Sequence, residues 1–215
     1  MNNETYFAKL EQIIVSLKRL RSDGIAIAKR IIGETLTKDD LFFCASLDRC
    51  LHLLDGIITL LQERNLTCAG ALLRLQMDNC MRTYAAFIAA DRAKVVDCLI
   101  YGTPINKEKD TNGKRMNDGY LKDQITKMDS QFTRVFDQAS GYVHLSDKAF
   151  YQTVTDIDDD GKLTLQIGQA LPEKRNDPLL ECAEAFCHFV NLHYKMLEPV
   201  VESKKRFYTA NRKTT

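Results

Sequence analysis

Apolar residues recur at helical spacing along most of the chain, which predicts a fold built mainly from helices. From Thr5 to Ile32 they follow one another three or four positions apart, and the run "KRLR" is polar enough to face water. Glycine is a poor helix former, so Gly24 is predicted to bend this first helix or to split it.

Capping residues mark the start of two further long helices. Thr37 and Asp40 stand three positions apart in the pattern of a capping box, and the helix that follows is predicted to reach about Arg64. Asn65 then breaks or caps the chain before a third helix, "LTCAGALLRLQMDNCMRTYAAFIAAD". Because the joint between these helices is so short, we expect them to pack as an antiparallel pair.

Shorter helices alternate with polar segments in the middle of the chain. After the short helix "RAKVVDCLIY", residues 102–118 are rich in Gly and Asn and are predicted to form a mobile surface loop. Helical spacing returns from Leu121 to Phe136, and this helix is expected to end at Ser140 and Gly141.

The last helix has clear signals at both ends. Asp177 is a suitable cap and Pro178 a suitable first-turn residue, so the helix is predicted to begin there. Pro199 is predicted to kink or stop it. The basic residues 206–215 that follow are expected to fray as a tail.

One segment follows a strand pattern instead. In "YQTVTDIDDDGKLTLQIG" apolar residues alternate on either side of an Asp-Gly pair, which indicates a β-hairpin at about residues 152–168. The sequence therefore predicts an all-α fold, a single antiparallel helical bundle of five to seven helices with one inserted β-hairpin. We expect residues 1–205 to form one domain.

Composition limits the function classes. Of 215 residues, 30 are Lys or Arg and 29 are Asp or Glu, so the chain lacks the strong positive field of a dedicated nucleic-acid binder. The seven cysteines include no CxxC pair, which argues against a zinc or redox site and favours a reducing compartment. No apolar run is long enough for a membrane span, so we expect a cytoplasmic protein without a membrane partner or a cofactor.

Three groups of residues resemble metal sites, and for none of them do we predict a metal. Asp156, Asp158, Asp160 and Gly161 match the first half of a calcium-binding EF-hand loop, but Ile167 stands where the bidentate glutamate is required. The second helix carries further oxygen and nitrogen ligands on one face, and the last helix carries a weaker pair of histidines: Asp48, His52 and Asp55, then His188 and His193.

The candidate catalytic residues are His144, Arg74, Asp78 and Arg82. The last three stand four positions apart on the third helix, so Asp78 can pair with either arginine. The spacing leaves open whether this ladder faces solvent or forms a polar cluster inside the bundle. His144 lies between apolar neighbours after a helix end, where it either bonds to a backbone carbonyl in the core or pairs with the third helix.

The segments "AGALLRLQMDNCMRTYAAF" and "SGYVHLS" resemble those of a family of uncharacterised prokaryotic helical proteins over about residues 40–195. That family is similar in architecture to HEPN domains, many of which are metal-independent ribonucleases of toxin–antitoxin and phage-defence systems. Their signature places an arginine four to six residues before a histidine. Here Arg49 and His52 are separated by two residues, and His144 follows no such arginine.

The resemblance implies a HEPN-like helical binding or interaction domain of a prokaryotic defence or stress module, acting as a homodimer and with an RNA or protein partner. The departure from the signature favours binding over cleavage. The first alternative is a metal-independent ribonuclease that uses His144 with Arg74 or Arg82. The second is an RNA-binding module that uses the basic tail from Lys204 to Lys213.

Overall fold

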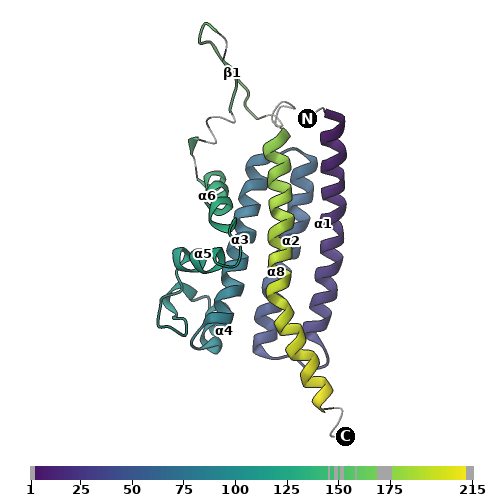
Figure 1. The fold of residues 1–215 in the computed structure, drawn as a ribbon, viewed down its shortest axis with the longest axis vertical. Coiled ribbons are helices and arrows are strands. Elements are labelled where there is room, and N and C mark those ends of the chain that lie inside the picture. The colour runs from purple at the N-terminus through teal and green to yellow at the C-terminus, as the bar shows by residue number, and fades with distance from the viewer. Residues whose placement is uncertain are drawn as a thin grey trace.

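Four long helices lie side by side in the computed structural model and form the body of the molecule (Figure 1). The model describes residues 3–144, 146–147, 150, 153–157, 159–168 and 176–211. The long helices alternate in direction from the first to the third, and the last runs antiparallel to the second: α1 (Asn3–Ile32), α2 (Lys38–Gln62), α3 (Leu66–Ile88) and α8 (Asn176–Asn211). The predicted all-α bundle is confirmed.

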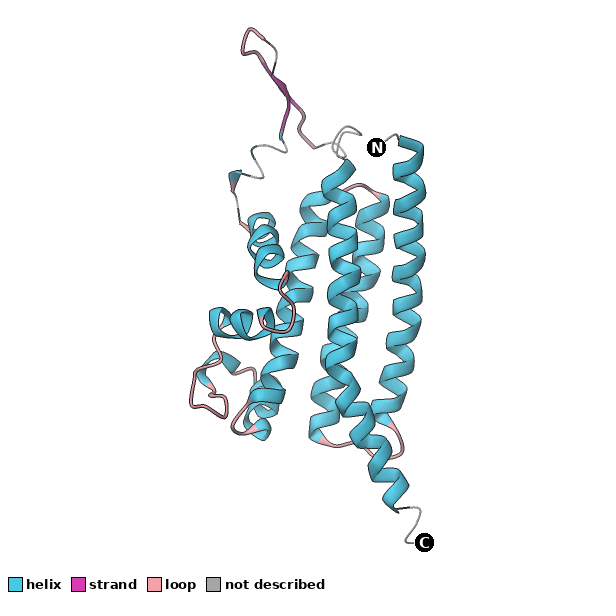
Figure 2. Cartoon of the chain, in the orientation of Figure 1, coloured by secondary structure: helices cyan, strands magenta, loops and turns pink. Residues whose placement is uncertain are grey.

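Shorter elements pack on the outer side of α3. They are α4 (Arg92–Tyr101), the 3-10 turn η1 (Ile105–Lys107), α5 (Asp118–Thr126) and α6 (Phe132–Val143). Between α6 and α8 the chain forms a two-stranded antiparallel hairpin of β1 (Val154–Ile157) and β2 (Leu163–Leu165), which projects from the end of the bundle (Figure 2). The predicted hairpin is confirmed, with Gly161 in its turn at a φ of 78°.

Local capping explains where the helices begin. The Thr37 hydroxyl accepts from the Asp40 amide and the Asp40 carboxylate accepts from the Thr37 amide, so the predicted capping box is present. The Asn65 side chain accepts from the Cys68 amide at 3.1 Å and starts α3 as expected. These short-range bonds fix the first turns of α2 and α3.

Gly24 does not break α1, contrary to expectation. The helix is continuous from Asn3 to Ile32, and at Gly24 a side chain of α8 packs directly against the α1 backbone. The Tyr194 hydroxyl donates to the Leu20 carbonyl at 2.8 Å and lies where a Cβ on residue 24 would stand. The glycine therefore serves the contact between two helices and not a bend.

The helix expected from Leu121 to Ser140 is two helices. Its break falls at Asp129, whose carboxylate accepts from the Gln131 amide at 3.1 Å and whose carbonyl accepts from the Phe132 amide. The apolar spacing continues across this turn, so periodicity alone does not reveal it. The second helix, α6, also runs past Gly141 to Val143.

Residues 102–118 are more ordered than a loop of that composition suggests. Asp110 is buried and accepts from the amides of Asn112 and Lys114 and from the Tyr120 hydroxyl, which together hold its pKa below the usual value. Met116 is fully buried beside it. One carboxylate thus organises a turn that the sequence predicted to be mobile.

Pro199 does not stop α8, which continues to Asn211 and changes direction over its lower part (Figure 1). The basic tail was expected to fray, but it is helical as far as it is described. Lys204 is buried, donates to the Thr35 carbonyl at 2.5 Å and pairs with Asp40. Burial alone would raise the pKa of Asp40, but the bonds from Lys204 and Thr37 outweigh it and lower that pKa.

A layer of polar side chains crosses the apolar core between α2, α3 and α8. His193 is fully buried, and its Nε2 lies 3.2 Å from the Ser46 hydroxyl and 3.1 Å from the Thr83 hydroxyl. Asn79 donates to the Ser46 carbonyl at 2.8 Å. Burial lowers the pKa of His193 to about 3, so the imidazole is neutral at every physiological pH.

This neutral histidine predicts a loss of stability in acid. The unfolded chain binds a proton at His193 below a pH of about 6.5, whereas the folded chain does so only near pH 3. The free energy of unfolding therefore decreases as the pH is lowered from about 6.5 to about 3. Between pH 7 and 4 we expect the wild type to lose about 3 kcal/mol more than His193→Gln, measured by urea unfolding. His144→Gln, at an exposed histidine, is the control and should follow the wild type. Parallel curves for all three proteins would contradict the assignment.

Candidate functional site

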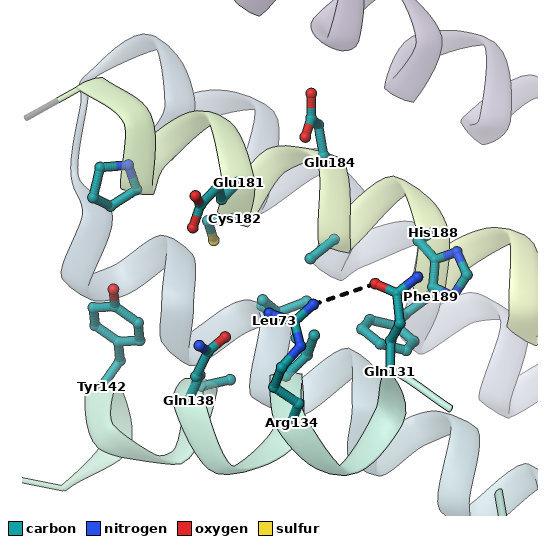
Figure 3. A pocket seen from close by; sticks show the side chains of 14 residues that line it. Leu73, Gln131, Arg134, Gln138, Tyr142, Glu181, Cys182, Glu184, His188 and Phe189 are labelled. Carbon is teal, nitrogen blue, oxygen red and sulfur yellow. Dashed lines mark hydrogen bonds between the residues drawn. The ribbon is translucent and has the colours of Figure 1, made fainter. Parts of the chain in front are cut away.

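A groove of about 530 Å³ runs between α6 and α8 (Figure 3). Apolar side chains form its floor, contributed by α3, α6 and α8: Leu73, Val135, Ala139 and Phe189. Polar side chains of the two helices stand along its sides. A groove with an apolar floor and polar walls is typical of a binding site.

At one end of the groove His188 pairs with Asp129. The His188 Nε2 hydrogen-bonds the Asp129 carboxylate, and the ring packs edge-to-face on Phe189 with centroids 5.0 Å apart. Asp129 is well buried because the turn before α6 holds it, whereas His188 remains about half exposed. The pairing occupies Nε2 and fixes the orientation of the ring.

The two walls of the groove differ in charge. The α6 wall carries Gln131, Arg134 and Gln138, and the Arg134 guanidinium donates to the Gln131 carbonyl oxygen at 3.4 Å (Figure 3). The α8 wall carries Glu181 and Glu184, for which the described part of the chain provides no ion-pair partner. The groove therefore has an excess of negative charge on its α8 side.

The groove holds no activated nucleophile among its described residues. Burial raises the pKa of the Cys182 thiol to about 12, so the lining cysteine is protonated at neutral pH. Burial also raises the pKa of the Tyr142 phenol and that of the nearby Cys187 thiol, the latter to about 11. The arrangement is suited to binding, with the His188 imidazole at one end of the groove.

Arg74, a residue of α3, contacts a face of α6 that does not line the groove. Its guanidinium stacks over the Phe136 ring at 3.7 Å from the centroid, and its Nε donates to the Ser140 hydroxyl at 3.3 Å. Arg74 therefore contacts α6 directly, at residues that precede His144.

Asp78 and Arg82 belong to a four-member charged network. Asp78 accepts from Arg82 on its own helix and from Arg49 on α2, both at 3.1 Å, and Arg82 also contacts Asp118 on α5 at 2.6 Å. The Asp78 side chain is 20% exposed, so the ladder lies neither in the core nor fully in solvent. The sequence left open whether this ladder faces solvent or lies inside the bundle, and the structure places it between these two cases.

His144 was expected to be packed down, and in this respect the expectation is wrong. The residue caps the end of α6 in an extended conformation and its side chain is exposed. Within the described residues its ring has no hydrogen bond to α3, although Ser140, one turn earlier, contacts Arg74. The structure brings Asp78 and Arg82 together but does not join His144 to them.

The three α2 residues weighed as metal ligands are each in polar contact with another side chain. His52 contacts Asp48 at 3.5 Å on an exposed face, and Asp55 pairs with Arg21 at 2.6 Å. The Asp158 position lies outside the described residues. Across the described ranges, no three His, Cys, Asp or Glu side chains are close enough to hold a metal ion.

Sequence reasoning missed the His188–Asp129 pair and the role of Arg49. A local signal for Asp129 exists, because Asp-Ser-Gln is a turn-forming sequence and implies a break before α6. No local signal links Asp129 to His188, which is 59 positions away. Their contact follows only from the packing of α6 against α8.

No family model, no curated protein and no solved structure matches this chain. None of the described helices combines the length and apolar character needed to cross a bilayer.

The intermediate burial of Asp78 predicts an intermediate cost of removing it. We expect Asp78→Ala to lower the free energy of unfolding by about 1 to 2 kcal/mol, between the effects of exposed and buried ion pairs. The matched control is Asp137→Ala, since Asp137 is 59% exposed and pairs with Lys122, and we expect it to cost less than about 0.5 kcal/mol. Urea unfolding measures the free energy of unfolding of both variants. Equal losses in the two variants would contradict the prediction that the more buried ion pair contributes more.

Proposed function

We propose that this chain is a HEPN-like helical binding domain that takes a basic amphipathic helix of a partner protein in the groove between α6 and α8. The observation that carries the proposal is a pair of exposed carboxylates, Glu181 and Glu184, which lie beside an apolar floor and have no ion-pair partner among the described residues. The assignment to a prokaryotic defence or stress module rests on the sequence resemblance.

The shape of the groove supports a helical ligand. Its walls are two helices, and a third helix laid between them would repeat the packing found elsewhere in the bundle. The side chains of the α6 wall, Gln131, Arg134 and Gln138, stand three and four positions apart. They therefore form a straight row along which an apolar stripe with the same spacing can lie.

The charge of the groove supports a basic ligand over nucleic acid. Arg134 is the one arginine or lysine among the lining residues, and Glu181, Glu184 and the Asp129 behind His188 oppose it. A polyanion would approach unpaired carboxylates at a cost, whereas lysines on a helix would neutralise them. His188 can donate or accept through Nδ1 at the end of the groove.

A pair of synthetic helices tests this proposal. The probes are fluorescein-labelled peptides of about 15 residues, one of leucine and lysine in helical spacing and one of leucine and glutamate. Fluorescence anisotropy should show that the Leu/Lys peptide binds at least about tenfold more tightly than the Leu/Glu peptide. In the Glu181→Lys/Glu184→Lys variant this preference should be reversed.

The matched control is Glu198→Lys, which changes an exposed carboxylate on α8 outside the groove. It should keep the wild-type preference, and an intact melting temperature in each variant excludes misfolding. Equal binding of both peptides, or an equal response in the control variant, would mean that the groove does not select its ligand by charge.

A second candidate function is a metal-independent ribonuclease that uses His144 with Arg74. The observation in its favour is that Ser140 holds the Arg74 guanidinium one helical turn from His144. Arg82 supports this reaction less well, because Asp78 and Asp118 already neutralise it. The basic tail supports RNA binding less well because Lys204 is buried against Asp40.

Incubation with mixed RNA in the presence of chelator separates binding from cleavage. If the protein is a binding domain, wild type and His144→Ala will both leave the RNA intact at all concentrations. Cleavage by the wild type that is lost in His144→Ala, at an unchanged melting temperature, would establish the nuclease instead.

A further inference from the structure

The outer face of α1 carries a stripe of exposed residues that is arranged symmetrically about the middle of the helix. Residues three or four positions apart lie along it, with apolar and polar members interspersed. Its members are all exposed: Phe7, Glu11, Val15, Lys18, Ser22, Ile25, Lys29 and Ile32. Four large apolar side chains on one helical stripe are more than scattered surface residues require.

Within the described chain α1 packs on α2 and α8. The residues of this stripe remain exposed, although the Arg64 guanidinium at the end of α2 lies 5.9 Å from the centroid of the Phe7 ring. Val15 is 63% exposed and Ile32 is 47% exposed. The buried side of the same helix is formed by other residues, among them Leu10, Ile14 and Leu17. The helix therefore has a second apolar seam that the bundle does not cover.

The order of residues along the seam matches its own reverse. Val15 and Ile25 are both five positions from residue 20, and Glu11 and Lys29 are both nine positions from it. At the two ends, Phe7 is thirteen positions and Ile32 twelve positions from residue 20. When two copies of α1 lie antiparallel about an axis near residue 20, apolar groups meet apolar groups. Glu11 of each copy then faces Lys29 of the other.

From this symmetry we propose that the chain forms a two-fold symmetric dimer through antiparallel packing of α1 on its own copy. A stripe selected for a different partner has no reason to be complementary to its own reverse, whereas an isologous interface requires it. Lys18 then faces Ser22 and not another lysine. The formal net charge of +1 presents no long-range repulsion to the pairing.

The size of the seam sets the expected strength of the dimer. From Phe7 to Ile32 the stripe is about 37 Å long, and with a helix width of about 12 Å each copy contributes about 450 Å². The total of about 900 Å² is at the small end of specific interfaces, so we expect a dissociation constant on the order of 1 to 100 µM. Sedimentation velocity over that concentration range measures it directly.

Charge exchange provides the sharpest test. In Glu11→Lys, lysine faces lysine twice across the axis, and in Lys29→Glu, glutamate faces glutamate. Each single variant should therefore raise the dissociation constant by about fivefold to tenfold at low salt, and less at high salt. The double variant Glu11→Lys/Lys29→Glu restores opposite charges and should return to within about twofold of the wild type.

The apolar part of the seam has its own test and control. Val15→Glu buries two carboxylates in the dimer and should raise the dissociation constant by more than about tenfold. The controls are Leu99→Glu on α4 and Glu198→Lys on α8, which are exposed and outside the seam, and they should leave it unchanged. A monomer at every concentration would overturn the proposal, as would a dimer that tolerates Val15→Glu or is not rescued by the charge exchange.

Discussion

The rest of the structure depends on the position at which α8 packs along the other helices. This helix completes the bundle, carries one wall of the groove and provides the residues that hold it in place. Apolar contacts alone tolerate sliding of one helix along another, because they are not directional. His193 between Ser46 and Thr83, Tyr194 on the Leu20 carbonyl, and Lys204 on Asp40 are directional, and a slip of one turn breaks all of them.

The geometry of the groove depends on the position of α8 along the bundle. His188 stands five positions before His193 on the same helix, so the buried histidine fixes the height of the exposed one. Asp129 reaches His188 because the turn before α6 is held by its own amide bonds. The two histidines show how burial divides one residue type into two roles. One ring is kept neutral inside the core and specifies packing, and the other is about half exposed and available to a ligand.

Features encoded by neighbours in sequence were predictable, and features created by distant contacts were not. The capping box at Thr37 and the Asp-Gly hairpin turn depend on a few consecutive residues, and both are present. Gly24 was misread because its effect depends on what packs against it. The ladder of Asp78 and Arg82 was visible in the sequence, but Arg49 and Asp118, which decide its burial, come from other helices.

The two proposed surfaces are compatible because they lie on opposite sides of the bundle. In Figure 1 α1 forms one edge and α6 lies beyond α3 on the other, so a dimer joined through α1 leaves both grooves open. Two grooves on one rigid dimer turn the second binding event into an intramolecular one for any ligand that presents two basic helices at the right separation. A weak groove and a weak dimer then reinforce each other, since a divalent partner binds the dimer more tightly than the monomer and shifts the association equilibrium towards it.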